Sequence, residues 1–198
     1  DSVASRGLGD VYKRQSMNVT SQNVLIITTS LRSRSNSDML AEVFADGAKA
    51  AGHHTEIISL KDKNIAFCKG CLACQKTGSC VIKDDAVQIT EKMKNADVIV
   101  WATPIYYYEM SGQMKTMIDR ANSLYSSDYS FRDVYLLSAA AENGTHTDER
   151  AVIGLEGWIA CFDKARFAGK VFAGGVNAPA DISEHSALKE AYELGKSI

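Results

Sequence analysis

Five short runs of apolar, mostly β-branched residues recur along the chain, and a helical pattern follows each of them. The runs are 24-VLIITTS-30, 55-TEIISL-60, 97-DVIVWATP-104, 134-VYLLSAA-140 and 170-KVFAGGV-176. Near-continuous apolar runs of this length are typical of parallel strands that are covered on both faces. Strands separated by helices form parallel sheets, because each crossover returns right-handed. We therefore predict an α/β fold with a doubly wound five-stranded parallel sheet, strand order 2-1-3-4-5 and helices on both faces.

Helical periodicity predicts the elements that cover this sheet. The expected helices span residues 37–51, about 85–94, 111–124, 151–167 and a terminal stretch from Ser183. Cys161 falls inside the fourth of them and is expected to be a small buried hydrophobe. His53 and His54 follow Gly52 and are expected to be surface residues. In such a sheet ligands bind outside the carboxyl ends of the strands, so the loops after strands one, three and four are expected to carry function.

The first sixteen residues are expected to be a non-native leader without folded structure. Ser5–Gln15 reads SRGLGDVYKRQ, which matches an in-frame read-through of a transposon sequencing adapter. Met17 is then the expected start, and residues 17–198 form a single domain that can bury a substantial core.

Charge and hydropathy exclude several classes of partner. Without the leader the formal charge is −3, which argues against non-specific binding of nucleic acid. No apolar run approaches the length of a membrane span, and no Lys/Arg run suggests a membrane surface. The crowded cysteines make a poor disulfide framework and no export signal is visible, so we expect a reducing cytoplasm.

The loop after the first strand, 29-TSLRSRSNSD-38, is rich in hydrogen-bond donors. It has neither G-x-G-x-x-G nor a P-loop, so the standard dinucleotide and triphosphate fingerprints are absent. Serines, an asparagine and two arginines at a helix N-terminus suit a monophosphate. One of these residues alone would serve as a helix cap, whereas the loop supplies far more than a cap needs.

The loop after the third strand, 103-TPIYYYEMSG-112, holds three consecutive tyrosines. They could pack on a neighbour as part of a proline turn. They could also form an aromatic wall against a flat heteroaromatic ligand. A loop that suits a monophosphate and an aromatic wall at a neighbouring strand end together predict a binding site for FMN.

The sequence resembles the flavodoxin-like NAD(P)H-dependent FMN reductases, a family that includes the iron–sulfur flavoproteins. The resemblance is carried by 30-SLRSRSNSDMLA-41, by the cysteine block from Cys68 to Asp85 and by 103-TPIYYYEMSGQMKTMIDR-120. There is one departure: Thr29-Ser30 stands where many members have Gly-Ser, which affects the close approach of the backbone.

The resemblance implies a set of FMN-binding residues. The phosphate roles fall on Ser30, Arg32, Ser35, Asn36 and Ser37. The residues implied to contact the ribityl chain and the ring are Thr103, Pro104, Ile105, Tyr106 and Tyr107. Those implied to contact the far edge of the flavin are Ser138, Ala139 and Ala140. NAD(P)H is implied as cosubstrate, and no catalytic acid or base is named because the flavin carries the chemistry.

The cysteine block 65-IAFCKGCLACQKTGSC-80 admits several explanations. A zinc site is disfavoured, because all-cysteine zinc sites usually use two separated knuckles. The spacing C-x2-C-x2-C with a more distant fourth cysteine resembles ferredoxin-type ligation of a [4Fe-4S] cluster. Iron–sulfur flavoproteins share this block, with Cys68, Cys71, Cys74 and Cys80 as the matching ligands. Cluster-free relatives carry similar cysteines that line the flavin pocket, so both alternatives stand.

Two functions therefore remain. One is an enzyme that passes electrons from NAD(P)H through FMN to a small acceptor such as a flavin or a quinone. The other is an iron–sulfur flavoprotein that carries electrons to or from a protein redox partner. Carriers of the flavodoxin type tend to be strongly acidic, and the mild charge of this chain favours the enzyme. The family also implies a homodimer or a higher homo-oligomer.

Overall fold

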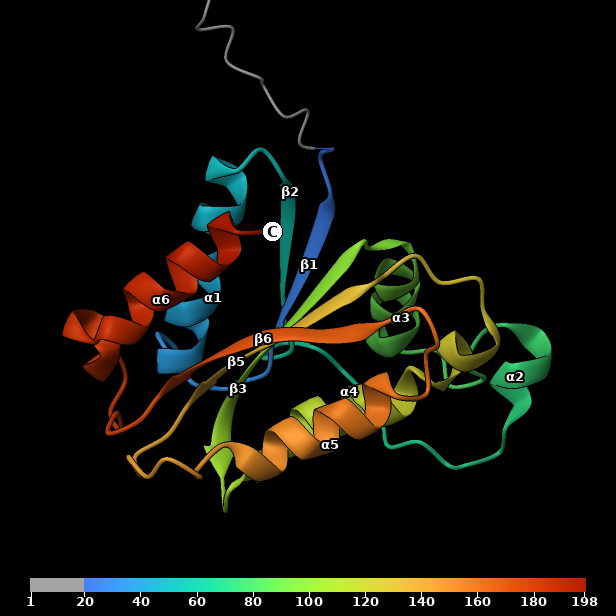
Figure 1. The fold of residues 1–198 in the computed structure, drawn as a ribbon. Coiled ribbons are helices and arrows are strands. Elements are labelled where there is room, and N and C mark those ends of the chain that lie inside the picture. The colour runs from blue at the N-terminus through green and yellow to red at the C-terminus, as the bar shows by residue number, and fades with distance from the viewer. Residues whose placement is uncertain (1–19) are drawn as a thin grey trace, which may run out of the picture.

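A parallel sheet with helices on both faces forms the body of the protein in a computed structural model, which describes residues 20–198 (Figure 1). The parallel strands are β1 (Asn23–Thr28), β2 (His54–Ser59), β3 (Val98–Tyr106), β5 (Asp133–Ala139) and β6 (Arg166–Ala173). Their spatial order is β2-β1-β3-β5-β6, which confirms the predicted order 2-1-3-4-5. A short strand, β4 (Glu109–Met110), pairs antiparallel with β3 and was not predicted. The predicted leader lies outside the described residues.

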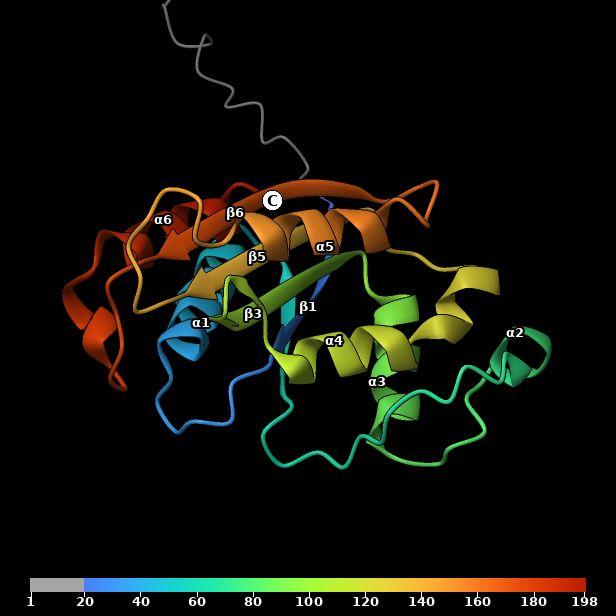
Figure 2. The same ribbon diagram turned by 90° about the horizontal axis from the view of Figure 1, so that it is seen from below.

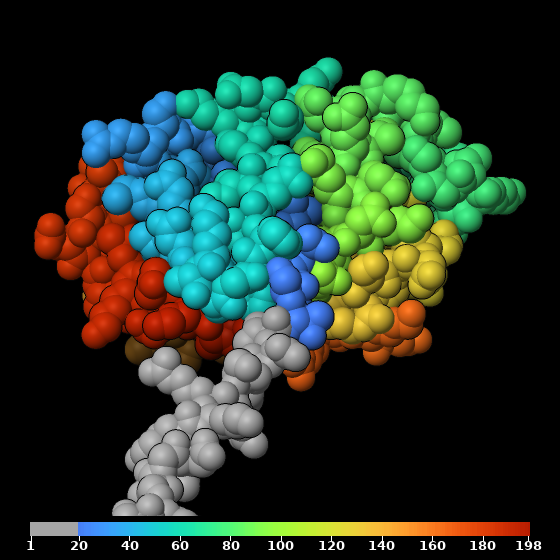
Figure 3. Space-filling view, turned by 90° about the horizontal axis from the view of Figure 1, so that it is seen from above, coloured from blue at the N-terminus to red at the C-terminus, as the bar shows by residue number. Residues whose placement is uncertain are grey.

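Helices cover the two faces of the sheet unequally. On one face lie α1 (Asn36–Ala50) and α6 (Ser186–Lys196), and on the other α3 (Asp85–Asn95), α4 (Gly112–Arg120) and α5 (Glu149–Ile159) (Figure 1). Short elements complete the chain: α2 (Ala73–Thr77), and the 3-10 helices η1 (Asn122–Ser126) and η2 (Asp181–Glu184). The α2 segment stands out at one edge of the molecule (Figure 3). Within residues 20–198 no helix is long and apolar enough to cross a membrane.

The largest error in the predicted elements concerns the fourth helix. It was expected to run to residue 167, but α5 ends at Ile159 and β6 begins at Arg166. The apolar sequence 158-WIACF-162 continues the helical pattern. The helix nevertheless ends before Phe162, whose ring packs against those of Phe131 and Trp158. Cys161 is consequently exposed, which corrects the expectation of a buried residue.

The expectation of an exposed His53 is also wrong, because this side chain is buried between the residues before β1 and Ile198. Its Nδ1 accepts a hydrogen bond from the Gln22 amide, and its Nε2 lies 2.9 Å from the carbonyl oxygen of Ile198. His54 is exposed, as expected. The second partner of His53 is remote in sequence, so no local pattern announces its burial.

The close crossing of α1 and α6 depends on two glycines. A Cβ atom on Gly195 would overlap the carbonyl oxygen of Phe44, and one on Gly47 would overlap the carbonyl oxygen of Tyr192. Both overlaps involve backbone, which cannot move aside as a flexible side chain can. These glycines therefore let the two helices approach at backbone distance.

We expect Gly195→Ala to lower the free energy of unfolding by about 1–3 kcal/mol through overpacking. Gly157→Ala is the matched control, because Gly157 lies in α5 and a Cβ atom there would meet no other atom within 4 Å. That substitution should raise stability by roughly 0.5–1 kcal/mol through its helix propensity. Urea denaturation measures both, and a neutral or stabilising Gly195→Ala would contradict the close-packing argument.

Candidate functional site

The loop between β1 and α1 presents backbone donors at the carboxyl edge of the sheet. Ser35 caps α1: its hydroxyl accepts from the Asp38 amide at 3.0 Å, and its carbonyl accepts from the Met39 amide. The amides of Asn36 and Ser37 precede the first hydrogen bond of the helix and so have no partner in it. Ser30, Ser35, Asn36 and Ser37 are all buried, whereas Arg32 is exposed. The arrangement offers N–H groups and a positive helix end to an anion.

A second loop, residues 177–182, braces this first one, and no sequence pattern had indicated it. The Asn36 side-chain amide donates to the Ala178 carbonyl at 3.0 Å, and Asn36 Oδ1 accepts from the Ile182 amide at 3.2 Å. The Arg32 guanidinium donates to the Asn177 carbonyl at 2.6 Å. Two of the predicted phosphate ligands are thus engaged with main chain. The buried amide of Asn36 holds the loop in shape. The Ser30 hydroxyl accepts from the Arg32 amide, and the Ser35 hydroxyl caps the helix and lies 3.3 Å from that of Ser37. The O–H of Ser30 and the backbone amides of Asn36 and Ser37 remain for a ligand.

Asp38 is an acidic residue at this helix start to which the sequence had assigned no role. Burial raises the pKa of Asp38, and the neighbouring Ser35 and Thr28 side chains oppose that rise only in part. Its Oδ1 is buried without a hydrogen-bond partner among residues 20–198. Asp38 is therefore a partly buried carboxyl group in the first turn of α1, beside the capping residue Ser35.

The three tyrosines form the tip of a hairpin rather than a proline turn. Ile105 pairs with Met110 and Tyr106 with Glu109, which leaves Tyr107 and Tyr108 as the two turn residues. Both have positive φ, 50° and 66°, as a type I′ turn requires. Such φ values cost residues other than glycine roughly 1–2 kcal/mol each. The Tyr107 side chain is 97% exposed, so this strained turn holds an aromatic ring in solvent.

Not every residue of the predicted aromatic wall faces outward. Tyr106 is half-exposed, whereas Thr103 and Ile105 are buried. The Thr103 hydroxyl accepts from the Ser111 amide at 3.0 Å, and the Ser111 hydroxyl in turn caps α4 by accepting from the Met114 amide. Thr103 therefore fixes the base of the hairpin, while the tyrosines form its surface.

Thr29, the residue that departs from the family pattern, has a structural role of its own. Its hydroxyl donates to the Ala102 carbonyl at 3.1 Å and lies 2.9 Å from the Ser111 hydroxyl. The two partners belong to the neighbouring strand β3 and to the cap of α4. The threonine side chain therefore joins the end of β1 to the start of α4 inside the protein.

The last two residues of β5 and Ala140, which follows them, add the third edge of the site. Ser138 and Ala139 lie beside Thr103 and Pro104 in the register of β5 on β3. Ser138 is fully buried, and its hydroxyl has no hydrogen-bond partner among the described residues. Ala139 and Ala140 are also buried. The structure thus brings the three predicted loops to one edge of the sheet (Figure 2).

The four cysteines of the block surround one small cavity of about 30 Å³. The Gly70 backbone amide donates to Cys68 Sγ and the Asn122 side-chain amide donates to Cys74 Sγ, both at 3.4 Å. Within residues 20–198, however, no three His, Cys, Asp or Glu side chains stand in an arrangement that would hold a metal ion. The thiols therefore share a cavity without forming a ready-made coordination sphere.

A buried ion pair holds the cysteine loop in place. Arg120, at the end of α4, donates to both carboxylate oxygens of Asp84 at 2.7 and 2.8 Å, and both side chains are almost fully buried. The same guanidinium donates to the carbonyls of Ala66 and Ile82. Asp84 also accepts from the amides of Ala66 and Ala86, the second of which caps α3. One pair thus joins two helices to both ends of the loop.

The charge state of Asp84 follows from these contacts. Burial by itself raises the pKa of Asp84, but the hydrogen bonds from Arg120 and from the Ala66 and Ala86 amides outweigh it and hold the pKa below the ordinary 3.8. The hydrogen bond to Asp84 raises the pKa of Arg120. Both groups are therefore ionised at neutral pH. Asp85, the second member of the acidic pair, accepts from the Asn64 amide at 2.6 Å.

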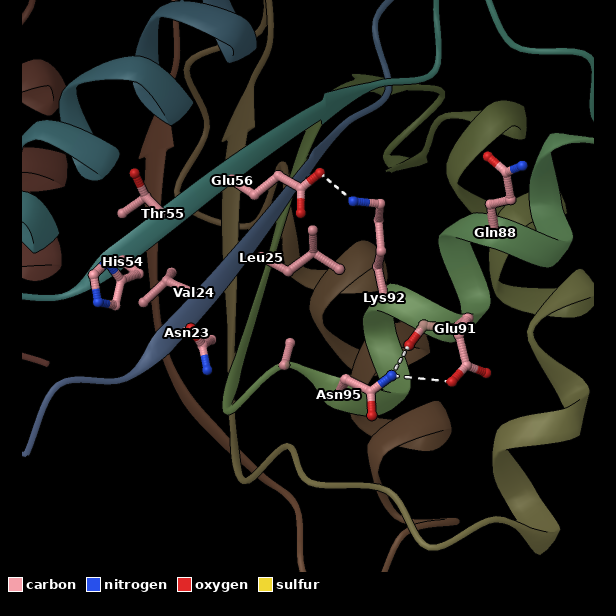
Figure 4. A pocket seen from close by; sticks show the side chains of 11 residues that line it. Asn23, Val24, Leu25, His54, Thr55, Glu56, Gln88, Glu91, Lys92 and Asn95 are labelled. Carbon is pink, nitrogen blue, oxygen red and sulfur yellow. Dashed lines mark hydrogen bonds and ion pairs between the residues drawn. The ribbon is translucent and has the colours of Figure 1, made fainter.

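Two further hollows lie outside the three loops. The larger of the two, about 630 Å³, lies at the amino ends of β1 and β2 beside α3, where an ion pair joins Glu56 and Lys92 (Figure 4). That is the opposite end of the strands from the three loops, so it is not the candidate site. The other, about 410 Å³, is lined by Cys68, Cys161 and the aromatic residue Trp158, and it adjoins the cysteine cavity.

The comparisons with known proteins identify the family. The family described as NADPH-dependent FMN reductase matches residues 22–176, and the chain belongs to it. An iron–sulfur flavoprotein of Archaeoglobus fulgidus is 45% identical over 98 residues, which are 50% of this chain and 48% of that protein. The chain thus spans about half the length of the first curated relatives that it matches.

Solved structures share the fold. An NAD(P)H:quinone oxidoreductase from Methanothermobacter marburgensis has a TM-score of 0.73 at 19% identity, over 90% of this chain and 96% of its own. An FMN-dependent NADH-azoreductase from Bacillus anthracis, solved in complex with FMN, has a TM-score of 0.61 at 17% identity, over 89% and 98%. These likenesses confirm the flavodoxin-like architecture that the sequence predicted.

We expect Asp84→Asn to cost about 3–5 kcal/mol of stability at pH 7, because it leaves the Arg120 charge buried and unpaired. Folding lowers the pKa of Asp84. Its contribution to the free energy of unfolding is therefore fully present above the ordinary carboxyl pKa of 3.8. It is lost as the pH falls through the lower pKa of the folded state. The difference between wild type and variant in denaturant unfolding should therefore narrow below about pH 4.

The matched control is Asp119→Asn, which removes an exposed ion pair with Lys115. Its effect should stay below about 1 kcal/mol. An Asp84→Asn protein as stable as this control at pH 7 would show that the buried pair does not anchor the loop.

Proposed function

We propose that this protein is an oxidoreductase that binds FMN and passes electrons from NAD(P)H to a small acceptor such as a flavin or a quinone. The observation that carries the proposal is the pairing of two loops at one sheet edge. One presents backbone amides and buried serine hydroxyls at the start of α1, and the other presents exposed tyrosine rings. A phosphate and a flat ring joined by a short chain match that pair of surfaces.

The residues fit FMN in specific ways. Ser30, Ser35 and Ser37 would bind the phosphate together with the amides of the loop, while Arg32 and Asn36 keep the loop in shape through residues 177 and 178. The unpaired hydroxyl of buried Ser138 supports a polar contact near the loop after β5. Bound FMN would supply hydride acceptance from the nicotinamide and electron transfer to the acceptor, while the protein orients the ring.

Turnover tests this function directly. Protein loaded with FMN should oxidise NADH or NADPH under anaerobic conditions when a quinone or free flavin is the acceptor, and the flavin absorbance should bleach when the acceptor is left out. A flavin-loaded protein that neither bleaches nor oxidises either nucleotide would exclude the enzyme. It would leave a carrier that needs a partner reductase.

A second candidate function rests on the cysteine cavity. We propose that Cys68, Cys71, Cys74 and Cys80 hold a [4Fe-4S] cluster, which would make the chain an iron–sulfur flavoprotein with a protein redox partner. The support is that all four thiols line a single cavity, that two of the sulfurs accept N–H groups, and that the Arg120 guanidinium lies next to Cys80. Positive charge and N–H donors favour thiolate ligands. The cluster, if bound, would supply single-electron transfer.

Anaerobic purification with iron and sulfide analysis tests the cluster. About four irons per chain are expected, and Cys74→Ala should lose them while it retains flavin. Cys161→Ala is the matched control, since that thiol lies outside the four-cysteine cavity, and it should retain iron. Flavin without iron in the wild type would show that the thiols only line a pocket.

A further inference from the structure

A hollow of about 410 Å³ brings together two thiols that lie far apart in the sequence. Cys68, from the cysteine loop of residues 68–80, and Cys161, from the turn after α5, both line it. The C-terminal end of α5 and the cysteine loop lie at the same end of the molecule (Figure 1). A hollow of this size is comparable to a site for one small molecule, so the two thiols on its wall lie within a few side-chain lengths of each other.

Cys68 is the member of the cysteine block that borders two cavities. All four thiols of the block line the small cavity of about 30 Å³, but of the four only Cys68 also lines the larger hollow. Cys161 lines the larger hollow and not the small cavity. Both Cys68 and Cys161 are exposed and reduced. Cys68 therefore has three thiols as neighbours on one side and Cys161 on the other.

The two thiols differ in how firmly the protein holds them. Cys161 lies between Trp158 and Phe162, whose ring centroids are 5.0 Å apart, and the Phe162 ring also packs against Phe131 at 5.2 Å. In contrast, no side chain of residues 68–80 is buried. The hydrogen bond that Cys68 Sγ accepts comes from the Gly70 amide, within the same loop. The loop can therefore bring Cys68 toward a fixed Cys161 without breaking core packing.

We propose that Cys68 and Cys161 are a redox-active pair, which a hydroperoxide converts to a disulfide in the iron-free protein and which a dithiol reduces again. The bond requires the two Cα atoms to come within about 7 Å of each other, which the exposed loop permits. A cluster on the four thiols would occupy Cys68, so the cluster and the disulfide exclude each other. The proposal goes beyond the proposed function and requires neither FMN nor a cluster.

The reaction balances with hydrogen peroxide as the oxidant. One cysteine sulfur attacks a peroxide oxygen, an S–O bond forms as the O–O bond breaks, and the leaving hydroxide becomes water with the thiol proton. The second sulfur then attacks the sulfenic acid, an S–S bond forms as the S–O bond breaks, and the second water leaves with the remaining thiol proton. The two thiols lose two electrons, and the peroxide gains them.

Peptide mapping of the full chain tests the pairing, because trypsin separates the relevant cysteines. Cys68 falls in peptide 64–69, Cys71 and Cys74 in 70–76, Cys80 in 77–83 and Cys161 in 151–164. Protein freed of iron with a chelator is treated with equimolar hydrogen peroxide, its remaining thiols are alkylated, and the monomer is digested without reduction. Mass spectrometry should find peptide 64–69 joined to 151–164, and dithiothreitol should release both. Cys161 that is still alkylated, or that is joined to 70–76, to 77–83 or to a second chain, would overturn the proposal.

Cys68→Ser and Cys71→Ser form a matched pair of variants. Both thiols are exposed in the same loop and line the small cavity, but only Cys68 lines the hollow with Cys161. After peroxide treatment Cys161 should be lost to alkylation in Cys71→Ser, as in the wild type, and should stay alkylatable in Cys68→Ser. The same response of Cys161 in both variants would contradict the pairing. Failure of the flavin function would appear separately, as a protein that oxidises neither nucleotide, because no step of this test uses FMN.

Discussion

The buried ion pair between Asp84 and Arg120 is the interaction on which the arrangement of this protein depends. It connects the end of α4, the start of α3 and both ends of the cysteine loop through one carboxylate and one guanidinium. A buried pair of this kind costs desolvation, and it stabilises only when the remaining donors and acceptors are also satisfied. Here the backbone groups of Ala66, Ile82 and Ala86 satisfy most of them. Within the pair, only the Nε of Arg120 has no partner among the described residues.

This anchor explains how a polar, thiol-rich segment can stand outside the body of the fold. Residues 68–80 include no buried side chain, so hydrophobic packing does not hold them. The ion pair closes the segment at its base and places its four thiols around one cavity. Because Arg120 also belongs to the helix that follows the tyrosine hairpin, the cysteine cavity and the proposed flavin site share one rigid support.

Hydrogen bonds between distant segments organise the other half of the site in the same way. Residues 177–182 fix the loop after β1, and Thr29 joins that loop to the cap of α4 through Ser111. The proposed phosphate site is therefore shaped before a ligand arrives, which reduces the entropic cost of binding. The turn at Tyr107 and Tyr108 differs from these loops, because its positive φ values are unfavourable for residues other than glycine. Its function is therefore to present the two tyrosine rings.

Much of the fold could be predicted because its signals are local. Runs such as 24–30 and 97–104 specify buried parallel strands, and the sequence around Ser35 specifies a capped helix. The rest depends on partners far away in the chain. Asn36 contacts residues more than 140 positions later, and no local pattern shows that its amide is engaged. Nor does the motif ending in Arg120 reveal that its partner is Asp84 in the cysteine block.

The helix expected to reach residue 167 shows the opposite case, in which a local pattern misleads. Trp158 and Phe162 follow helical spacing, but their rings complete an aromatic cluster with Phe131. The chain therefore turns early enough for β6 to pair with β5 from Arg166 onward.

The affinities of the flavin-free protein for FMN and for riboflavin, compared by fluorescence quenching, decide most directly whether the loop after β1 is a phosphate site. If it is, FMN should bind roughly a hundredfold more tightly, since several charge-assisted hydrogen bonds to its phosphate are lost in riboflavin. Equal affinities would contradict this assignment, because they would mean that the amides and serines at the start of α1 do not bind the phosphate.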